Sequence, residues 1–442
     1  MKRTKARRRP LISADGEGVA SHAGSLLLHE LADRVGLTGA LSRACAPAFR
    51  DVRVHDPGVV LRDLAVMIAD GGDCLSHLCV LRDQPDLFGR VASDATAWRV
   101  IDRLEQVGMG ALDAARAQAR RRAWAAGLQP ERITLDIDST LVTAHSEKEG
   151  AAATYKRGFG FHPLLCTLDE TKEVLAGILR PGNATANNAA DNIAVLDAGL
   201  AQLPTRAAVE PILVRSDSAG ATHDLVAAVR DRELRFSIGF DLTAPVREAI
   251  LALPGNAWTP ALRQDGEQRD GADVAELSAL DLRAWPADTR AICRREMPHP
   301  GAQLTFSDVN GYRFQVFVTD QPDADIAYLE ARHRAHARVE DRIRCAKDTG
   351  LRSLPFHDFA ANAAWLQLVL MAIDLLAWTQ GITLEGEARS WEPKRLRYAL
   401  LHVAARLCRG GRQLHLRLQR TWPWSALLNA AFQRIRRLPL PA

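Results

Sequence analysis

The chain has 442 residues, of which 47% are hydrophobic and 25% charged, a balance typical of an ordinary soluble protein with a large core. This length predicts about two to four domains of ~100–200 residues each. No apolar run follows the basic N-terminus, which argues against a secretory signal, and the most apolar segment, residues 363–378, is shorter than the ~20 residues of a membrane span. We therefore expect a cytoplasmic protein without membrane contact.

Charge is distributed unevenly along the chain, although the formal net charge is only +4. Residues 1–10 contain six Lys/Arg and residues 393–442 contain eleven, with no acidic residue in either segment, which leaves 40 of the 57 basic residues and all 53 acidic residues between them. Basic ends neutralise phosphate and an acidic middle binds cations, so the pattern favours a nucleic-acid enzyme. Simple solubility tails are the alternative.

The seven cysteines occur without CxxC pairs. Cys74, His77 and Cys79 lie close together in the sequence, but no second pair of ligands follows at zinc-finger spacing. We therefore expect reduced thiols and no structural zinc at these cysteines.

The first 129 residues predict a flexible arm and a helical domain. Residues 1–20 are basic and then rich in Gly, Ala and Ser, as in flexible arms. In residues 21–129 apolar residues recur at spacings of three and four, and Ser93 has the chemistry of an N-cap. A helical domain of this size either binds DNA or mediates dimerisation, and the sequence does not distinguish the two.

Residues 130–240 predict the first part of an α/β domain. Residues 133–138 alternate between apolar and polar, which places Asp136 and Asp138 on one face of a strand. Further strands are predicted at residues 160–168, 174–179, 211–215 and 235–240, and helices at residues 188–203 and 221–231. This order predicts a mixed sheet with helices on its faces.

Residues 241–324 predict a β-rich insertion, because the helical signal fades and Asn310-Gly311 separates two strand-like runs at 304–306 and 314–318. Residues 325–385 predict the second part of the core, with a long helix at 325–348 and an apolar helix at 359–378.

Residues 386–442 predict a basic region made of a hairpin and a helix. The hairpin is expected to pair residues 400–407 with 413–418 around Gly410-Gly411, and a short amphipathic helix is expected after Pro423. Alternating arginines there predict a face that follows phosphates, for which the candidates are Arg412, Arg417 and Arg420.

Two aspartates and a glutamate are the candidate catalytic residues. Asp138 lies at the end of one predicted strand, Asp217 follows another, and Glu340 lies on the long helix. Carboxylates from two strands and a helix can hold two divalent metals and transfer phosphoryl groups. Taken singly, Asp138 is also a common turn residue and Asp217 a common N-cap, so the interpretation depends on all three together.

The helix that carries Glu340 has further polar residues at helical spacing. His333, His336 and Lys347 fall on the face of Glu340, which fits a metal beside a DNA phosphate. A solvated face with incidental ion pairs is the alternative. Asp136 is either a partner of the metal ligands or merely their neighbour.

These motifs resemble those of the DDE transposases of bacterial insertion sequences, in particular the "thirteen-eighty" group, which is related to the insertion-sequence-four group. The resemblance extends from about residue 20 to the C-terminus. It is carried by Leu135-Asp136-Ile137-Asp138-Ser139-Thr140, by Arg215-Ser216-Asp217-Ser218, and by Glu340 followed by Lys347. In the family pattern Y-x2-R-x3-E-x6-K, this chain has His333 and His336 in the Tyr and Arg places.

The resemblance implies an RNase H-like core with a β-strand insertion between the second Asp and the Glu. It implies that Asp138 bridges two Mg2+ ions, or Mn2+ in their place, and that Asp217 and Glu340 each complete one metal site. The implied activity is cut-and-paste transposition, in which a homodimer cleaves double-stranded DNA at terminal inverted repeats and joins the ends to target DNA. The implied location is the bacterial cytoplasm, in association with the nucleoid.

The resemblance also implies roles for residues around the metals. Lys347 and His336 would steady phosphate charge near the break. Trp258 and Trp285 would stack on an extruded base, although tryptophans at such positions also serve as core residues. Two other activities are compatible with the sequence: a catalytically idle DNA-binding protein, and a metal-dependent nuclease of the same fold.

Overall fold

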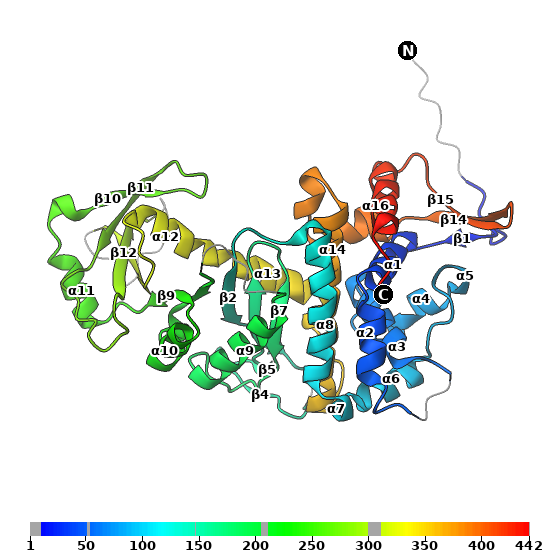
Figure 1. Ribbon diagram of the computed structural model, residues 1–442, viewed down its shortest axis with the longest axis horizontal. Coiled ribbons are helices and arrows are strands. Elements are labelled where there is room, and N and C mark those ends of the chain that lie inside the picture. The colour runs from blue at the N-terminus through cyan, green and yellow to red at the C-terminus, as the bar shows by residue number, and fades with distance from the viewer. Residues whose placement is uncertain (1–9, 51–53, 146, 205–210, 299–310, 442) are drawn as a thin grey trace, which may run out of the picture.

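The computed structural model describes residues 10–50, 54–145, 147–204, 211–298 and 311–441. Its elements lie in three groups along the long axis of the molecule (Figure 1). A strand-rich lobe occupies one end and a central sheet with its helices occupies the middle. A helical bundle, which includes the last helix of the chain, occupies the other end.

Short helices from the first third of the chain build much of the bundle. They are α1 Leu26–Arg34, α2 Leu37–Cys45, α3 Pro57–Ala69, α4 Cys79–Arg82, α5 Pro85–Phe88, α6 Asp94–Asp102, α7 Leu104–Val107 and α8 Met109–Ala123. Ser93 accepts a hydrogen bond from the backbone N–H of Thr96 and caps α6. The predicted helical character of this region and its N-cap at Ser93 are confirmed.

The central sheet contains five strands in the order β7-β6-β2-β8-β9, with β2 parallel to β8, β8 parallel to β9, and β6 antiparallel to both β2 and β7. These strands are β2 Thr134–Ser139, β6 Leu164–Leu168, β7 Val174–Ile178, β8 Leu213–Ser216 and β9 Arg235–Phe240, joined in part by helices α9 Ala189–Gln202 and α10 His223–Asp231. This mixed α/β arrangement confirms the predicted fold class and is consistent with an RNase H-like DDE fold.

One predicted strand, residues 160–168, is two strands in different sheets. β5 Phe159–Phe161 pairs with β3 Val142–Thr143 and β4 Ala152–Ala153 in a small sheet, whereas β6 joins the central one. Pro163 separates them, and because proline has no backbone N–H it cannot continue the ladder.

The insertion extends the central sheet. Strands β10 Thr259–Leu262, β11 Gln268–Glu276, β12 Arg290–Glu296 and β13 Arg313–Thr319 add to it in the order β10-β11-β12-β13-β9. The predicted β-rich character is confirmed, but the sequence interpretation missed helix α11 Ala244–Leu251. Of the predicted hairpin, residues 314–318 lie in β13, which pairs with β12 and β9, and residues 304–306 lie outside the described part of the chain.

The single helix predicted at residues 325–348 is wrong in one respect. It is divided into α12 Ile326–Arg334 and α13 Arg338–Ala346 by a 3-10 turn at Ala335–Ala337. Side chains from outside the helix occupy carbonyls at the break, because Arg215 donates to the Arg332 carbonyl at 2.7 Å and Gln264 to the Ala331 carbonyl at 2.8 Å. These side chains add acceptor contacts near the end of α12, where the Ala335 N–H still donates to the Ala331 carbonyl.

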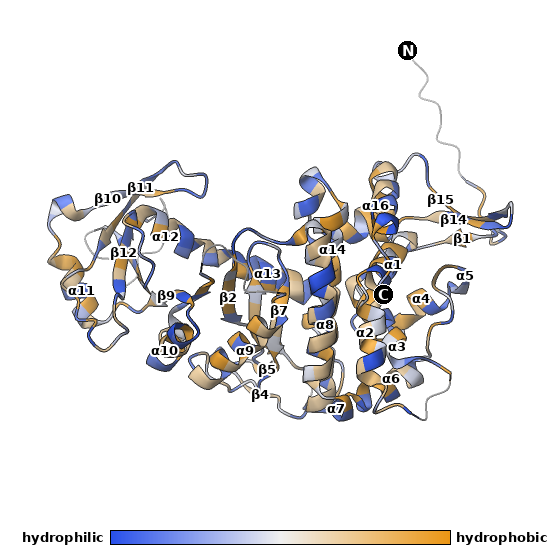
Figure 2. Cartoon of the chain, in the orientation of Figure 1, coloured by the Kyte–Doolittle hydropathy of each residue, from blue (hydrophilic) through white to orange (hydrophobic). Residues whose placement is uncertain are grey.

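Helix α14, Phe359–Thr383, packs between the central sheet and the bundle and is the apolar helix predicted at 359–378, extended by one turn. It is long and apolar enough to cross a membrane, but 78% of its most apolar window is buried in the fold. It is therefore a core helix, as expected. In Figure 2 hydrophobic residues are prominent in the bundle and central strands, whereas α13 is mostly hydrophilic.

The C-terminal elements join the bundle rather than standing apart. Strand β14 Ala405–Gly410 pairs with β15 Gln413–Leu418 and with β1 Val19–Ala20, and helix α16 Ser425–Arg437 packs on α1 and α14. Arg436 donates to Glu30 at 2.6 Å and 2.9 Å across this contact. The predicted hairpin and final helix are confirmed, but the first strand begins at Ala405 because residues 397–401 form a helical turn.

Candidate active site

The two aspartates lie at one edge of the central sheet because they follow paired positions on parallel strands. Ile137 of β2 is paired with Ser216 of β8, so Asp138 and Asp217, the next residues, lie side by side where these strands end. Glu340 lies in the first turn of α13, which runs past the central sheet in Figure 1. Asp138 is half-buried, and Asp217 and Glu340 are exposed.

Burial and the charges of two nearby carboxylates raise the pKa of Asp138 to about 6. Burial is the largest cause, the charge of Asp217 is the next, and Glu340 adds to the effect. His336 and a hydrogen bond from the Ser139 N–H, at 2.7 Å, act in the opposite direction. Asp217 and Glu340 therefore both lie close enough to Asp138 for their charges to act on it.

The alternative reading of Asp217 as an N-cap is also realised. Its Oδ1 accepts a hydrogen bond from the Ala219 N–H at 3.1 Å, at the start of the turn Ser218–Gly220. One oxygen is thereby oriented by the backbone. The cap fixes the carboxylate and does not exclude it from binding a cation.

Asp138, Asp217 and Glu340, called the trio below, are not packed as closely as the ligands of a single ion. Within the described part of the chain, groups of three ligand atoms within 4.8 Å of one another occur elsewhere, and the trio does not form such a group. A site for two divalent ions does not require all of its carboxylates to lie that close together, so the arrangement is compatible with one.

Asp136 belongs to a network of buried ion pairs close to Asp138 in the chain. Arg215 donates from Nε at 2.8 Å and from Nη2 at 2.7 Å to the two oxygens of Asp136, and its Nη2 also donates to Asp169 at 2.9 Å. His336 Nδ1 lies 2.7 Å from Asp136 Oδ1. Burial alone would raise the pKa of Asp136, but the His336 contact and the Arg215 charge lower it. Asp136 therefore holds Arg215 and His336 in place near the three candidate carboxylates.

The predicted polar face of the Glu340 helix is only partly present. His333 stacks on Phe317 with ring centroids 4.3 Å apart and lies 2.9 Å from Ser237 Oγ. Burial is the main cause that lowers the pKa of His333 to about 3, so the ring is neutral and part of the core. His336 is turned toward Asp136, and Lys347 lies near Lys156 and Arg352, whose charges add to burial in lowering its pKa.

Comparison with known families identifies the family of this chain. The family model described as transposase DDE domain group 1 matches residues 2–440. The chain belongs to this family. The assignment supports transposition as the process and polynucleotidyl transfer as the class of reaction.

No curated protein matches this chain. Among solved structures, it is similar to a piggyBac transposase in a synaptic complex with hairpin DNA, with 10% sequence identity and a TM-score of 0.42 over 86% of this chain and 80% of that one.

The two candidate tryptophans of this DDE family member are both half-buried. Trp285 lies 4.6 Å from the His223 ring and 5.5 Å from the Phe240 ring, and Phe240 ends β9, the strand beside β8. Trp258 lies farther along the insertion, where the Arg295 guanidinium is 4.3 Å from its ring centroid. Trp285 therefore packs at the end of β9, next to the end of β8 that Asp217 follows.

The three candidate DNA-binding arginines lie in or just after the C-terminal hairpin. Arg412 is in the turn with φ of 64°, Arg417 is on β15, and Arg420 follows it. All three are exposed, and none forms an ion pair with another described residue. Arg417 lies directly opposite Arg406 of β14, an arrangement of like charges that is unfavourable unless an anion is bound.

Sequence reasoning missed the role of Arg215 and Asp169. A signal was present, because Arg215 interrupts an apolar run that predicts a buried strand, and a buried arginine requires a carboxylate partner. Asp136 and Arg215 each lie two residues before one of the candidate aspartates, and the register of β2 and β8 pairs them.

Proposed function

We propose that this chain cuts DNA at the terminal inverted repeats of an insertion sequence and joins the freed 3′ ends to target DNA. The observation that carries the proposal is the placement of Asp138 and Asp217 side by side on adjacent parallel strands, with Glu340 close enough to act on the charge of Asp138, in a member of a DDE transposase family. From the motif resemblance we further propose that the element belongs to the "thirteen-eighty" group and that the protein acts in a bacterial cytoplasm, on the nucleoid.

The three carboxylates are proposed to hold two Mg2+ or Mn2+ ions, with Asp138 between the two sites and Asp217 and Glu340 on either side. When bound, such ions activate a water or a 3′-hydroxyl for in-line attack and stabilise the leaving oxygen. The fit is electrostatic, because a half-buried carboxylate with two further carboxylates nearby is stabilised by a dication.

The residues around the carboxylates are proposed to orient them and to hold the DNA. Arg215 and His336 fix Asp136, and thereby the strand end from which Asp138 projects. Lys347, with Lys156 and Arg352 nearby, forms a cationic group suited to phosphate. His336 can add to that charge when it is protonated.

Contacts farther from the carboxylates are proposed to come from the insertion and the tail. Trp285, and less directly Trp258, would stack on an unpaired base, and the exposed arginines of the hairpin would bind phosphates, namely Arg412, Arg417 and Arg420. The active form is proposed to be a homodimer on double-stranded DNA.

The decisive experiment measures cleavage and joining of a linear DNA that carries the element's own ends, in Mg2+ or Mn2+. Asp217→Asn preserves shape and removes a negative charge, so both reactions are expected to be lost. Asp341→Asn is the matched control, because Asp341 is beside Glu340 on α13 but pairs with the exposed Arg344 at 3.0 Å.

The outcomes separate the candidate functions. Metal-dependent cutting and joining by the wild type and by Asp341→Asn, but not by Asp217→Asn, supports the proposal. Cutting without joining of a labelled 3′ end favours a nuclease of the same fold. Specific binding of the ends with no cutting favours an idle DNA-binding protein, and equal activity of wild type and Asp217→Asn removes the carboxylate assignment.

A further inference from the structure

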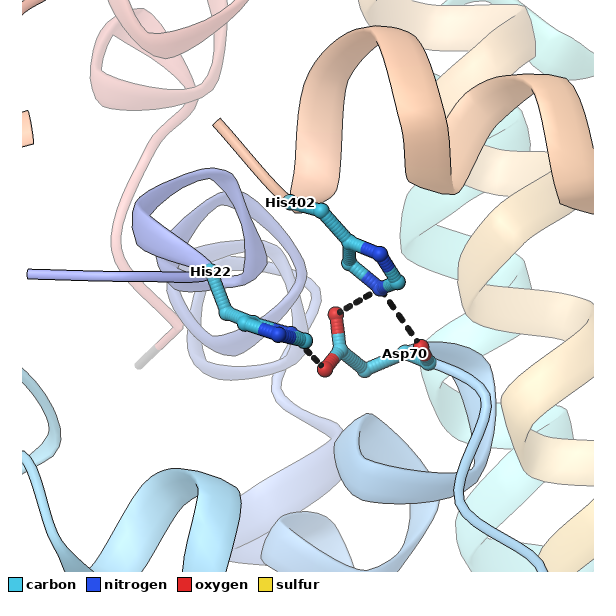
Figure 3. Close-up of side chains that lie close together, drawn as sticks. All are labelled: His22, Asp70 and His402. Atoms are coloured by element: carbon cyan, nitrogen blue, oxygen red, sulfur yellow. Dashed lines mark hydrogen bonds and ion pairs between the residues drawn. The ribbon is translucent and has the colours of Figure 1, made fainter. Parts of the chain in front are cut away.

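A second cluster of metal-ligand side chains lies in the helical bundle, far from the carboxylate trio in the fold. His22, Asp70 and His402 converge on one point, as Figure 3 shows, and one ligand atom from each lies within 4.8 Å of the other two. His22 Nδ1 is 2.6 Å from Asp70 Oδ2, and His402 Nε2 is 3.3 Å from Asp70 Oδ1 and 2.9 Å from the Asp70 carbonyl oxygen. The two imidazole rings lie 4.1 Å apart.

The surroundings hold these three side chains in place. The hydroxyl of the buried Ser25 donates to Asp70 Oδ1 at 2.5 Å, which leaves Oδ2 directed toward His22. The Asp70 side chain is 4% exposed, whereas those of His22 and His402 are 28% and 36% exposed, so solvent reaches the imidazole side of the cluster. His22 has φ of 51°, and a non-glycine residue in this left-handed region is held there by its surroundings at some cost.

We propose that His22, Asp70 and His402 bind one transition-metal ion of the zinc class. Two imidazoles and a carboxylate are a common ligand set for Zn2+, with solvent as a fourth ligand on the exposed side. Tetrahedral bonds of about 2.0–2.2 Å place donors about 3.3 Å apart. The separation of His402 Nε2 from Asp70 Oδ1 already has this value, and that of His22 Nδ1 from Asp70 Oδ2 needs to open by less than about 1 Å, so the two carboxylate oxygens face different imidazoles. The metal would replace the proton through which His402 Nε2 contacts the Asp70 carbonyl oxygen.

The chemistry of the donors distinguishes this site from the trio. Nitrogen donors favour Zn2+, Co2+ and Ni2+, whereas sites made only of carboxylates favour Mg2+ and Mn2+. Ser25 supplies the outer contact that commonly orients a ligating carboxylate. The two kinds of metal can therefore be loaded independently.

The bound metal ties together three segments that are remote in sequence. His22 precedes α1, Asp70 ends α3, and His402 lies three residues before β14. The backbones of the first and last segments are already in contact, because Ala23 N–H donates to the Val403 carbonyl at 3.1 Å and a Cβ on Gly24 would lie 1.8 Å from the Leu400 carbonyl oxygen. The metal therefore fixes the base of the arginine-bearing hairpin.

The test is zinc binding by the full chain, measured by atomic emission after chelation and re-equilibration with Zn2+ in excess Mg2+. We expect His402→Gln to bind one zinc fewer per chain than wild type, with affinity at this site reduced by at least about 100-fold. Substituted Co2+ is expected to give the visible bands of a nitrogen and oxygen site. Zinc is also expected to slow trypsin cleavage at the hairpin arginines in wild type and not in His402→Gln.

Two controls identify the site that binds. Asp73, Cys74 and His77 form the other candidate group within the described part of the chain, so His77→Gln is expected to leave the His402-dependent zinc unchanged, and a thiolate charge-transfer band with Co2+ would point to Cys74 instead. Asp217→Asn is expected to keep the zinc as well. If His402→Gln does not fold, His22→Gln takes its place. The proposal is overturned if no zinc binds, or if its stoichiometry is the same with and without His402.

Discussion

Replacement of Asp138 by Asn is expected to stabilise the metal-free protein. The fold raises the pKa of Asp138 from 3.8 to about 6, and each pKa unit corresponds to about 1.36 kcal/mol, so the ionised carboxylate costs up to about 3 kcal/mol at pH 7.5. Asp138 is only half-buried, and solvent screening reduces the expected gain to about 1–2 kcal/mol. The Asn side-chain oxygen can still accept the Ser139 N–H.

The pH dependence follows from the direction of the pKa shift. The folded protein binds the Asp138 proton more tightly than the unfolded chain, so the stability of wild type falls relative to Asp138→Asn as pH rises from about 4 to above 6. The extra stability of Asp138→Asn over wild type is therefore complete above about pH 6. It decreases as the pH is lowered from about 6 to about 4 and is absent below pH 3.8. Urea denaturation of both proteins across this range measures it.

A control and a ligand complete the assay. Asp341→Asn changes an exposed carboxylate on α13 and is expected to alter stability by less than about 0.5 kcal/mol, without the same pH dependence. Mg2+ at ten times its Kd is expected to stabilise wild type by about 1.4 kcal/mol and Asp138→Asn by less. An Asp138→Asn protein no more stable than wild type at pH 7.5 would refute the raised pKa of Asp138 in the folded protein.

Asp136→Ala is expected to lower the free energy of unfolding by about 3–5 kcal/mol, because the buried Arg215 loses its bidentate partner. A loss below about 1 kcal/mol in urea denaturation would contradict this prediction. Arg417→Gln is expected to weaken duplex binding about equally for all sequences. It is also expected to reduce the slope of log K against log salt concentration by about 1, as measured by fluorescence anisotropy, and an unchanged slope would show that Arg417 does not contact the DNA. Trp285→Ala is expected to weaken the binding of DNA with an unpaired base at the cleaved end by about 1–3 kcal/mol, and to weaken the binding of fully paired DNA very little. Equal losses for the two DNAs would argue against stacking.

The strands of the central sheet could be predicted because local pattern and final structure coincide there. Residues 133–138 alternate with period two, and β2 occupies Thr134–Ser139. The predicted strand at 235–240 has the same bounds as β9. Strong local signals of this kind also predicted that the aspartates follow strands, so two of the three candidate site positions could be placed without tertiary information.

The features that could not be predicted depend on contacts between distant residues. Near the break between α12 and α13, Arg215 and Gln264 donate to carbonyls of a helix that starts 62 or more residues later. The His22, Asp70 and His402 cluster joins positions that no local pattern relates. Two errors were avoidable because the sequence carries a signal for each. Pro163 marks the point where β5 ends before β6, and Arg215 interrupts an apolar strand.

The charges at the centre of the sheet fall into two layers with different electrostatics. In the lower layer, Asp136 and Asp169 are compensated by Arg215, and Arg338 adds a contact of 2.9 Å to Asp169. In the upper layer, Asp138, Asp217 and Glu340 form no ion pair with any described cationic side chain. A protein selected only for stability would not concentrate uncompensated anions above a neutralised layer, because the arrangement lowers stability near neutral pH. The missing positive charge is what a pair of divalent cations would supply, and the compensated layer beneath holds the strand ends rigid while they do so.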